Sequence, residues 1–116
     1  MKTFDRGNFA SFLPYEDNPS PVGFGSVCDA PHMHAVILEL FLENIRKGTR
    51  FLDVGCGSGY LTCCFAHLCP DGYSYGIDHI ESMMEFINKN IGKQHSNLLD
   101  DGRLIFRLGD ARKGLP

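Results

Sequence analysis

The stretch FLDVGCGSGY, residues 51–60, constrains the fold of this chain more than any other. An apolar run leads into Asp53, and glycines at positions 55, 57 and 59 separate it from an apolar pattern with helical spacing. A strand, a glycine turn and a helix in this order bring a nucleotide-type ligand against the backbone N–H groups at the start of a helix. Glycine is needed where the turn takes a positive φ or where a Cβ would collide with the ligand. The stretch therefore predicts a cofactor-binding turn.

The spacing of the glycines separates this turn from the turn of dinucleotide-binding proteins. G-x-G-x-G is one residue tighter at its end than the dinucleotide pattern G-x-G-x-x-G. Asp53 lies immediately before the turn, and Asp78 follows roughly 20 residues on, where an acid that binds a ribose is expected. Together these features favour a ligand with a single nucleoside. The alternative is an ordinary flexible loop, which rarely has a strand before it and both acids in place.

The composition is that of a small globular domain. With 116 residues, of which 43% are hydrophobic, the chain can form one domain with a core of its own. A formal net charge of −3 and the lack of any Lys and Arg run argue against nucleic acid and anionic membranes as partners. Glu39 and Glu43 interrupt the apolar run after His34, and the first residues have no signal-type core. We therefore expect a soluble, cytoplasmic protein.

The five cysteines, at positions 28, 56, 63, 64 and 69, have none of the paired C-x-x-C spacing of a zinc site. We expect them to be reduced, with the last three packed as small apolar residues in a helix. Nothing beside them indicates an environment that stabilises a thiolate, so the sequence predicts neither a catalytic cysteine nor a metal site.

Residues 1–28 form a segment of a different character. They are rich in Gly, Pro, Asn and Asp and carry several aromatic residues. The prolines at 14, 19 and 21 disfavour a helix. We expect a loop-rich aromatic cover segment without regular structure, and a frayed terminus is the alternative.

From Pro31 onward the pattern alternates between helices and strands. Pro31 occupies the favoured first turn of a helix, capped by Asp29 or Ala30 and ended by Gly48. Ile37, Leu40, Phe41 and Ile45 are its expected apolar face. Further expected elements are strands at 50–54, 73–78 and 103–108 and helices at 58–69 and 80–91.

This alternation predicts an α/β fold. Right-handed crossovers would give a partial doubly wound parallel sheet of about three strands, with helices on its faces. Ligands of such sheets bind beyond the carboxyl ends of the strands. Asp53, Asp78 and Asp110 all lie at or just after the predicted strand ends. We therefore expect the three acids to surround one site.

Four blocks of sequence resemble a known family. They are A-P-H-M-H-A at 30–35, L-D-V-G-C-G-S-G-Y-L-T at 52–62, G-I-D-H-I at 76–80 and G-D-A-R at 109–112. The glycine turn and the acids resemble class I S-adenosylmethionine-dependent methyltransferases. The first block narrows the resemblance to protein-L-isoaspartate (D-aspartate) O-methyltransferases.

The resemblance implies S-adenosyl-L-methionine as the cofactor and S-adenosyl-L-homocysteine as its product. Asp78 would bind the two ribose hydroxyls, and the glycine turn would approach the methionine part and the sugar. The residues that the resemblance assigns to the cofactor are Asp53, Gly55, Gly57, Ser58, Gly59, Asp78, His79, Asp110 and Ala111. A sulfonium cofactor carries no pyrophosphate, so acids around it are not repelled.

The implied reaction is methyl transfer to the free α-carboxylate of an isoaspartyl residue in a damaged protein. That carboxylate is already an anion at neutral pH, so positioning and the exclusion of water are the main requirements. The resemblance places Asp29 and His34 at the acceptor. Without it, His32 and His34 are more simply explained as surface or capping histidines. A metal site from H-x-H alone lacks a third ligand.

Asp29 departs from the family pattern, which has serine at this position. Aspartate is as good a helix cap as serine, but a carboxylate repels an anionic acceptor. We therefore expect Asp29→Ser to lower the Michaelis constant for an isoaspartyl peptide.

Family members are also substantially longer than this chain. The sequence thus resembles a truncated member with part of the sheet, and an open sheet edge would favour self-association. Two alternatives to the repair enzyme are another class I methyltransferase and a non-catalytic fragment that binds cofactor or associates with itself.

Overall fold

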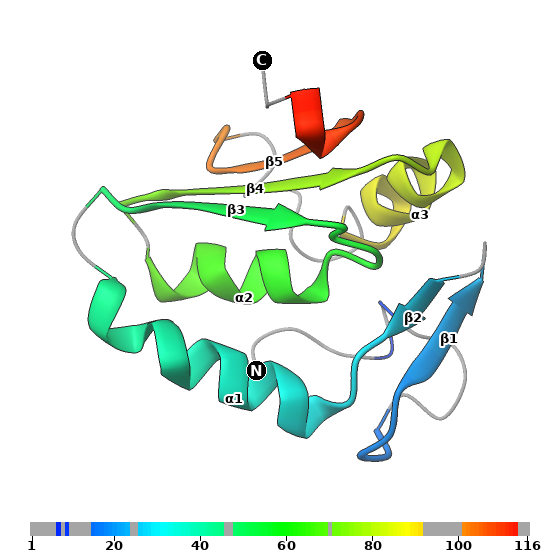
Figure 1. The fold of residues 1–116 in the computed structure, drawn as a ribbon, viewed down its shortest axis with the longest axis horizontal. Helices are drawn as coiled ribbons and strands as arrows, with labels where there is room; N and C mark the ends of the chain where they lie inside the picture. Colours follow the sequence, from blue (N-terminus) through cyan, green and yellow to red (C-terminus); the bar gives the residue numbers. More distant parts are fainter. Residues whose placement is uncertain are drawn as a thin grey trace.

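Three parallel strands form the centre of the molecule (Figure 1). They are β3 (Arg50–Val54), β4 (Tyr73–Asp78) and β5 (Leu104–Leu108), in the order β3-β4-β5. The computed structural model describes residues 7, 9, 15–23, 26–45, 48–69, 71–91 and 101–113. The predicted bounds of the first two strands are confirmed, and the third begins one residue later than expected. The α/β fold class is confirmed.

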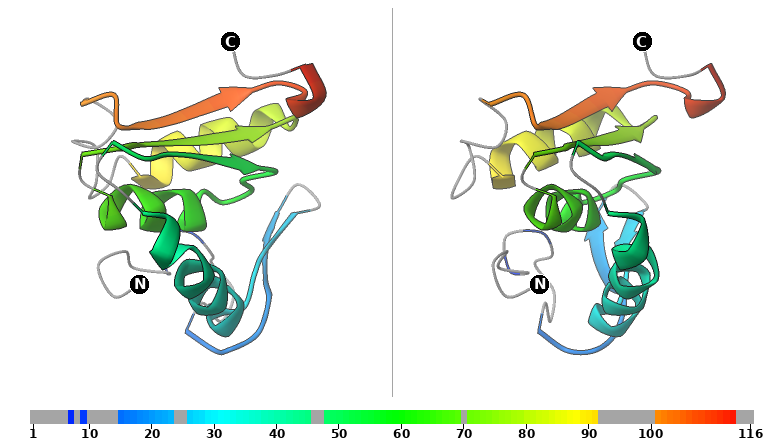
Figure 2. Two further views of the ribbon diagram at one scale, coloured as in Figure 1. Left: turned by 60° about the vertical axis from the view of Figure 1, so that its left-hand side comes forward. Right: turned by 90° about the vertical axis from the view of Figure 1, so that its left-hand side faces the viewer.

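The helices of the described part of the chain lie on one side of this sheet (Figures 1 and 2). They are α1 (Pro31–Phe41), α2 (Tyr60–Leu68) and α3 (Glu81–Ile91). Two short 3-10 turns, η2 (Leu42–Asn44) and η3 (Ala111–Lys113), follow α1 and β5. Among the described residues no helix is both long enough and apolar enough to cross a membrane.

Alternation along the strands decides which side chains meet the helices. From β3, Phe51 stacks on Phe65 of α2 with ring centroids 4.3 Å apart. From β4, the Ser74 hydroxyl donates to the backbone carbonyl of Thr62 over 2.8 Å. From α3, Met83, Ile87 and Ile91 are fully buried. The core therefore lies between the sheet and α2 and α3.

The Phe106 ring of β5 occupies space that two glycines leave open. A Cβ built on Gly76, its neighbour in β4, would lie 2.7 Å from Phe106 Cδ1, which is too close for any side chain. A Cβ built on Gly59 would lie 3.1 Å from Phe106 Cζ. The ring thus packs between the middle of β4 and the start of α2.

Helix α1 differs from its prediction in length and in orientation. It starts at Pro31 as expected but ends at Phe41, well before Gly48. Its buried residues are His34 and Leu38, whereas Leu40, expected in the core, is 70% exposed. Of the other expected residues, Ile37 packs against the core and Phe41 meets Phe65 of α2, so the predicted face is right in part and extends to His34 and Leu38 instead of Leu40.

Residues 20–28 contain regular structure that the sequence did not predict. β1 (Ser20–Gly23) and β2 (Ser26–Cys28) pair as an antiparallel hairpin with an irregular register. Pro21 is compatible with it because each strand of a two-stranded ribbon is an edge strand. The expectation of an irregular segment over 1–28 is therefore wrong for the two strands, and residues 1–6, 8, 10–14 and 24–25 lie outside the described residues.

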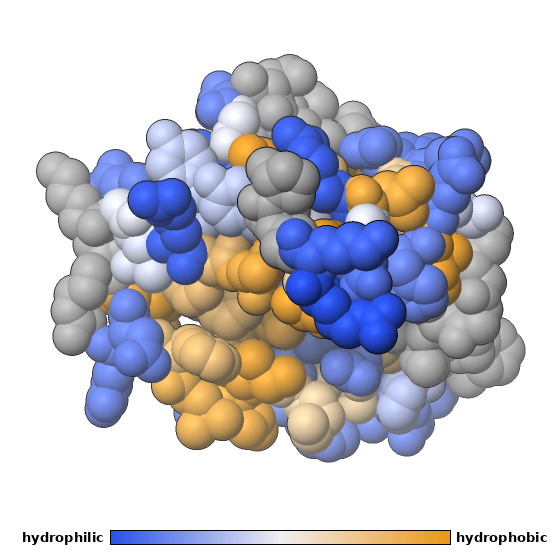
Figure 3. Space-filling view, turned by 45° about the horizontal axis from the view of Figure 1, so that its top comes forward, coloured by the Kyte–Doolittle hydropathy of each residue, from blue (hydrophilic) through white to orange (hydrophobic). Residues whose placement is uncertain are grey.

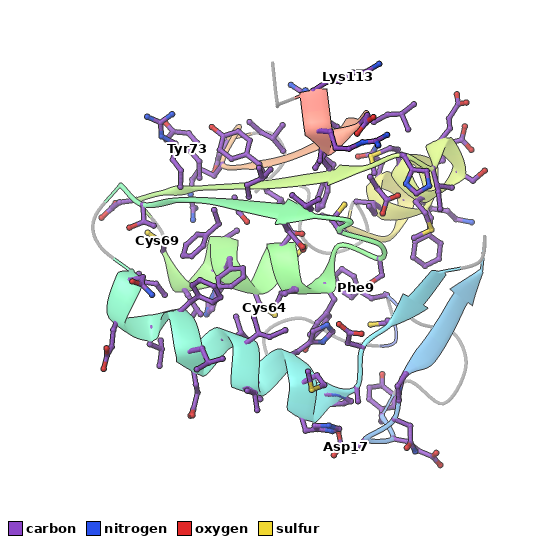
Figure 4. All side chains as sticks on the ribbon, in the orientation of Figure 1. Phe9, Asp17, Cys64, Cys69, Tyr73 and Lys113 are labelled. Atoms are coloured by element: carbon purple, nitrogen blue, oxygen red, sulfur yellow. The ribbon has the colours of Figure 1, made fainter. Side chains whose placement is uncertain are left out.

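The cap of α1 comes from that N-terminal segment. The backbone N–H of His32 donates to Asp17 Oδ1 over 2.9 Å, and His32 Nδ1 lies 2.9 Å from the same oxygen. Figure 4 shows Asp17 beside the start of α1. Of the two residues expected at the cap, Asp29 and Ala30, the structure has Ala30 as the N-cap residue, and its side chain makes no capping bond.

The opposite side of the sheet exposes apolar side chains. Leu52 and Val54 of β3 are 53% and 61% exposed, and Tyr73 of β4, at 45%, lies on the side away from α2 (Figure 4). Figure 3 turns this side toward the reader and shows apolar surface along it. Helices on both faces were expected from the alternation, and the described residues cover only one.

Candidate functional site

The carboxyl ends of the three strands lie at one edge of the sheet. The parallel register places Asp53 beside Gly76 and Asp78 beside Leu108. Asp110 follows β5 by two residues. The predicted grouping of the three acids at this edge is thus present in the backbone geometry.

The glycine turn after β3 is fastened to the end of β4. The backbone N–H groups of Gly55 and Cys56 both donate to the carbonyl of Ile77, over 2.8 and 3.2 Å. Gly55, Gly57 and Gly59 have φ values of 72°, 52° and 84°, in the region that disfavours any side chain. Because Gly57 and Gly59, on either side of Ser58, both have positive φ values, α2 begins at Tyr60 and not at Ser58 as predicted.

Asp78 connects the turn to the helix that follows. Its Oδ2 accepts from the N–H of Gly57 over 3.1 Å, and its Oδ1 accepts from the N–H of Ile80 over 3.2 Å. His79 Nδ1 lies 3.5 Å from Oδ1, although its ring is 82% exposed. Asp78 is 7% exposed. Its carboxylate is therefore held in one orientation by backbone donors.

Asp53 has a partner that the sequence did not reveal. Thr62 of α2 donates its hydroxyl to Asp53 Oδ2 over 2.8 Å. Burial raises the pKa of Asp53, the Thr62 hydrogen bond opposes this shift, and the charges of Asp29 and Asp78 add to it. The charges of Asp29 and Asp78, although smaller causes than burial, make the surroundings of Asp53 more negative and so favour a positively charged ligand group nearby.

Cys56 shares this environment. Burial, with smaller effects from Asp53 and Asp78, raises its thiol pKa to about 12. Burial likewise raises the pKa of Cys63 well above its ordinary value. All five cysteines are buried, and their reduced state stays a prediction.

Asp110 is paired with Arg112, which was not among the predicted site residues. Arg112 Nη2 lies 2.9 Å from Asp110 Oδ2, and Arg112 Nε lies 3.0 Å from Oδ1. The Arg112 side chain holds the pKa of Asp110 below its ordinary value. An arginine two residues after an acid can reach it in a tight turn, so this spacing in the sequence could have predicted the ion pair.

Two cavities flank the glycine turn. A cavity of about 540 Å³ is lined by Val54, Gly55, Ile77, Asp78, His79, Gly109, Asp110, Ala111 and Arg112. One of about 70 Å³ is lined by Cys28, Asp29, His34, Asp53, Gly55, Cys56, Gly57, Ser58 and Leu61. Gly55 belongs to both, so the two cavities meet at the turn.

Ten of the eleven predicted site residues line these two cavities. Gly59 lines neither, because its bare Cα leaves room for Phe106 instead. His34 is 4% exposed, so it is not the surface histidine that was the simpler explanation. Among the described residues no three metal-binding side chains come together.

A model of the family described as protein-L-isoaspartate(D-aspartate) O-methyltransferase matches residues 1–116. The chain belongs to this family. A protein-L-isoaspartate O-methyltransferase of Caenorhabditis elegans is 44% identical over 115 residues, which are 98% of this chain and 51% of that protein. Protein-L-isoaspartate O-methyltransferase 2 of Arabidopsis thaliana is 42% identical over 118 residues, 98% of this chain and 38% of that protein.

A solved structure shows the same fold within the protein-L-isoaspartate O-methyltransferase family. The enzyme of Plasmodium falciparum, crystallised in complex with S-adenosyl-L-homocysteine, superposes with a TM-score of 0.86 at 31% identity. The superposition covers 93% of this chain and 52% of that one. The chain spans about half the length of the C. elegans and P. falciparum relatives.

Proposed function

We propose that this protein transfers a methyl group from S-adenosyl-L-methionine to the free α-carboxylate of L-isoaspartyl or D-aspartyl residues in damaged proteins, and so initiates their repair. The observation that carries the proposal is the pair of cavities that meet at the glycine turn, in a chain of the protein-L-isoaspartate O-methyltransferase family. One cavity suits a nucleoside and the other suits a small reacting group.

The larger cavity fits the nucleoside half of the cofactor. Its volume of about 540 Å³ lies within the usual range for small-molecule sites. Asp78, the last residue of β4, lines this cavity. The remaining lone pairs of its carboxylate can accept hydrogen bonds from two ribose hydroxyls. Asp110 and Ala111 line the far end, where we place the adenine.

The smaller cavity fits the reacting end. When bound, the cofactor supplies an electrophilic methyl group on a positively charged sulfonium. The negative potential around Asp53, to which Asp29 and Asp78 contribute, stabilises positive charge at this place. The backbone of Gly55 and Gly57 lets a ligand approach the turn closely.

His34 and Asp29 line the side of this cavity away from the sheet. We assign His34 to the acceptor: an imidazole N–H can donate to one carboxylate oxygen and leave the other free to attack. Since the acceptor carboxylate is ionised at neutral pH, the rate of transfer depends mainly on its orientation and on the exclusion of water. Asp29 opposes the binding of an anion, so Asp29→Ser should lower the acceptor KM.

Binding of S-adenosyl-L-homocysteine, measured by calorimetry, tests the cofactor half. Asp78→Asn should weaken it about 10- to 100-fold, because a hydrogen bond to a charged group contributes about 1.5–3 kcal/mol. Asp71→Asn, an exposed acid in the turn before β4, is the matched control and should bind normally. No binding by the unaltered protein would leave only a non-catalytic, self-associating fragment.

Methylation of an isoaspartyl peptide, compared with its normal aspartyl twin, tests the acceptor half. Transfer to the first peptide alone supports the proposal. Cofactor binding without transfer to either peptide would instead favour a class I methyltransferase with another acceptor. A cytoplasmic location and self-association through an exposed sheet edge stay predictions, which fractionation and sedimentation measurements test.

A further inference from the structure

The imidazole of His34 does not stand alone in its cavity wall. It stacks on the phenol ring of Tyr60, with ring centroids 4.9 Å apart and an interplanar angle of 29°. Tyr60 in turn meets Phe9 edge-to-face, with centroids 5.2 Å apart and an angle of 83°. The three rings are 4%, 2% and 0% exposed. Offset-stacked and edge-to-face pairs are both favourable arrangements of aromatic rings.

Tyr60 also occupies a special place in the backbone. It is the first residue of α2 and follows Gly59, the last glycine of the turn, directly. Gly57 and Ser58 of the same turn line the small cavity together with His34. Figure 4 shows Phe9 at this end of α2, beside β2. A movement of the turn therefore moves the ring against which His34 rests.

We propose that Tyr60 is a positioning residue for methyl transfer: it holds the imidazole of His34 toward the acceptor and couples that orientation to the cofactor-binding turn. This inference rests on the proposed function, because it needs His34 to contact the acceptor. The side chain acts through His34 and touches neither reactant. The face of the phenol ring limits rotation of the imidazole, and the edge-to-face contact with Phe9 limits movement of the phenol ring.

A purely structural role is the competing explanation, since any buried tyrosine contributes to the core. The two explanations differ in what a ring-less variant loses. If Tyr60 only fills space, its removal lowers the melting temperature and leaves the kinetics of the folded fraction unchanged. If it positions His34, the acceptor KM changes in the folded fraction.

The test compares three variants of the full chain. Tyr60→Leu removes the ring, Tyr60→Phe keeps the ring and removes the hydroxyl, and Phe65→Leu removes another buried ring of α2. Phe65 stacks on Phe51 and meets Phe41, both away from the small cavity, so it is the matched control. Measurements are the melting temperature, the affinity for S-adenosyl-L-homocysteine and the acceptor KM and kcat for an isoaspartyl peptide.

We expect Tyr60→Leu to raise the acceptor KM about tenfold, well within the roughly 100-fold loss that a 1 Å misplacement can cause. Its affinity for S-adenosyl-L-homocysteine should change less than about twofold, since the cofactor contacts stay in place. Tyr60→Phe should retain the normal KM because it retains the stack. Phe65→Leu should lower the melting temperature and leave KM unchanged.

A second readout does not depend on activity. The ring current of Tyr60 displaces the carbon-bound imidazole proton resonances of His34, and NMR should show them return toward their random-coil positions in Tyr60→Leu alone. Should Tyr60→Leu not fold, Tyr60→Phe still decides, because a raised KM in that variant overturns the role of the stack.

The outcomes separate the inference from the function on which it rests. No methylation by the unaltered protein overturns the proposed function and the role of Tyr60 with it. Methylation with the same acceptor KM in the unaltered protein and in Tyr60→Leu overturns the inference alone. An equal rise of KM in Phe65→Leu also overturns it, since that result indicates a general loosening of α2.

Discussion

Replacing Thr62 by valine should destabilise this protein more than replacing it by serine, although valine is the closer match in shape. The Thr62 hydroxyl donates to Asp53 Oδ2 over 2.8 Å, and Thr62 is fully buried. A hydrogen bond to a charged group contributes about 1.5–3 kcal/mol, and valine forfeits it. Serine keeps the donor and loses one buried methyl group, at a cost of about 1 kcal/mol. The difference at pH 7 should be about 1 kcal/mol.

The difference should also depend on pH in a defined direction. The pKa of Asp53 in the folded state is raised above its ordinary value of 3.8, so the folded state binds the proton more tightly than the unfolded state. Stability therefore falls as the pH rises from 3.8 through the folded-state pKa, and the loss is complete above it. Thr62 is the one cause that lowers this pKa, so valine raises it further. The excess cost of valine is thus larger above the folded-state pKa of Asp53 than below it, so it should be larger at pH 7 than at pH 4.

Urea unfolding of both variants at pH 7 and pH 4, with comparable m values, measures this difference. A valine variant at least as stable as the serine variant at pH 7 would refute the reasoning, because the hydroxyl would then contribute nothing to Asp53. An excess cost that is equal at the two pH values would refute the link to ionisation alone.

Three further predictions address other parts of the molecule. Gly72→Ala should lower the free energy of unfolding by about 3 kcal/mol, because the new Cβ would overlap the backbone carbonyl oxygen of Thr49, and thermal unfolding measures the loss. Asp17→Ala should cost about 1 kcal/mol by removing the acceptor of the His32 N–H, whereas Asp17→Asn, its control, should cost only a few tenths; an equal loss would contradict the capping role. Cys56 should resist iodoacetamide at pH 8 in the folded protein, because its pKa of about 12 leaves almost no thiolate; rapid alkylation, detected by mass spectrometry, would contradict this.

The strands could be predicted closely because local signals bound them. An apolar run that ends in an acid and a glycine turn defines β3, and the turn at 70–72 with the acid at 78 defines β4. The start of α2 was placed two residues early because the positive φ values of the glycine turn are not evident from composition. Local chemistry thus determined the elements, and backbone conformation determined their ends.

The errors arose where pairing or packing between segments decides the structure, and not the local residue pattern. The β1–β2 hairpin lies in a proline-containing segment, and only pairing between its two strands makes it regular. The cap of α1 comes from Asp17, which is 15 residues away from His32. The buried face of α1 is defined by His34 and Leu38, since a stacked imidazole packs in a core as an aliphatic side chain does.

The residues of the candidate site likewise divide into those that the local sequence predicts and those that only packing reveals. Its acids and glycines could be predicted from the turn and the strand ends. Thr62 and Tyr60 could not, because their roles come from helix α2 lying against Asp53 and His34, and each residue alone is ordinary in a helix. Arg112 is the exception, since its distance in sequence from Asp110 was a usable signal.

The ring of Phe106 has a consequence for the dimensions of the nucleoside cavity. It fits only where Gly76 lies opposite it in β4, so sliding β5 by two residues would press the ring against Ser74 or Asp78. The side chain of Phe106 therefore fixes the register between β4 and β5. Because Asp78 ends β4 and Asp110 follows β5, this register also sets the position of Asp110 relative to Asp78. Phe106, which does not line the nucleoside cavity, thus determines the spacing between Asp78 and Asp110 in its wall.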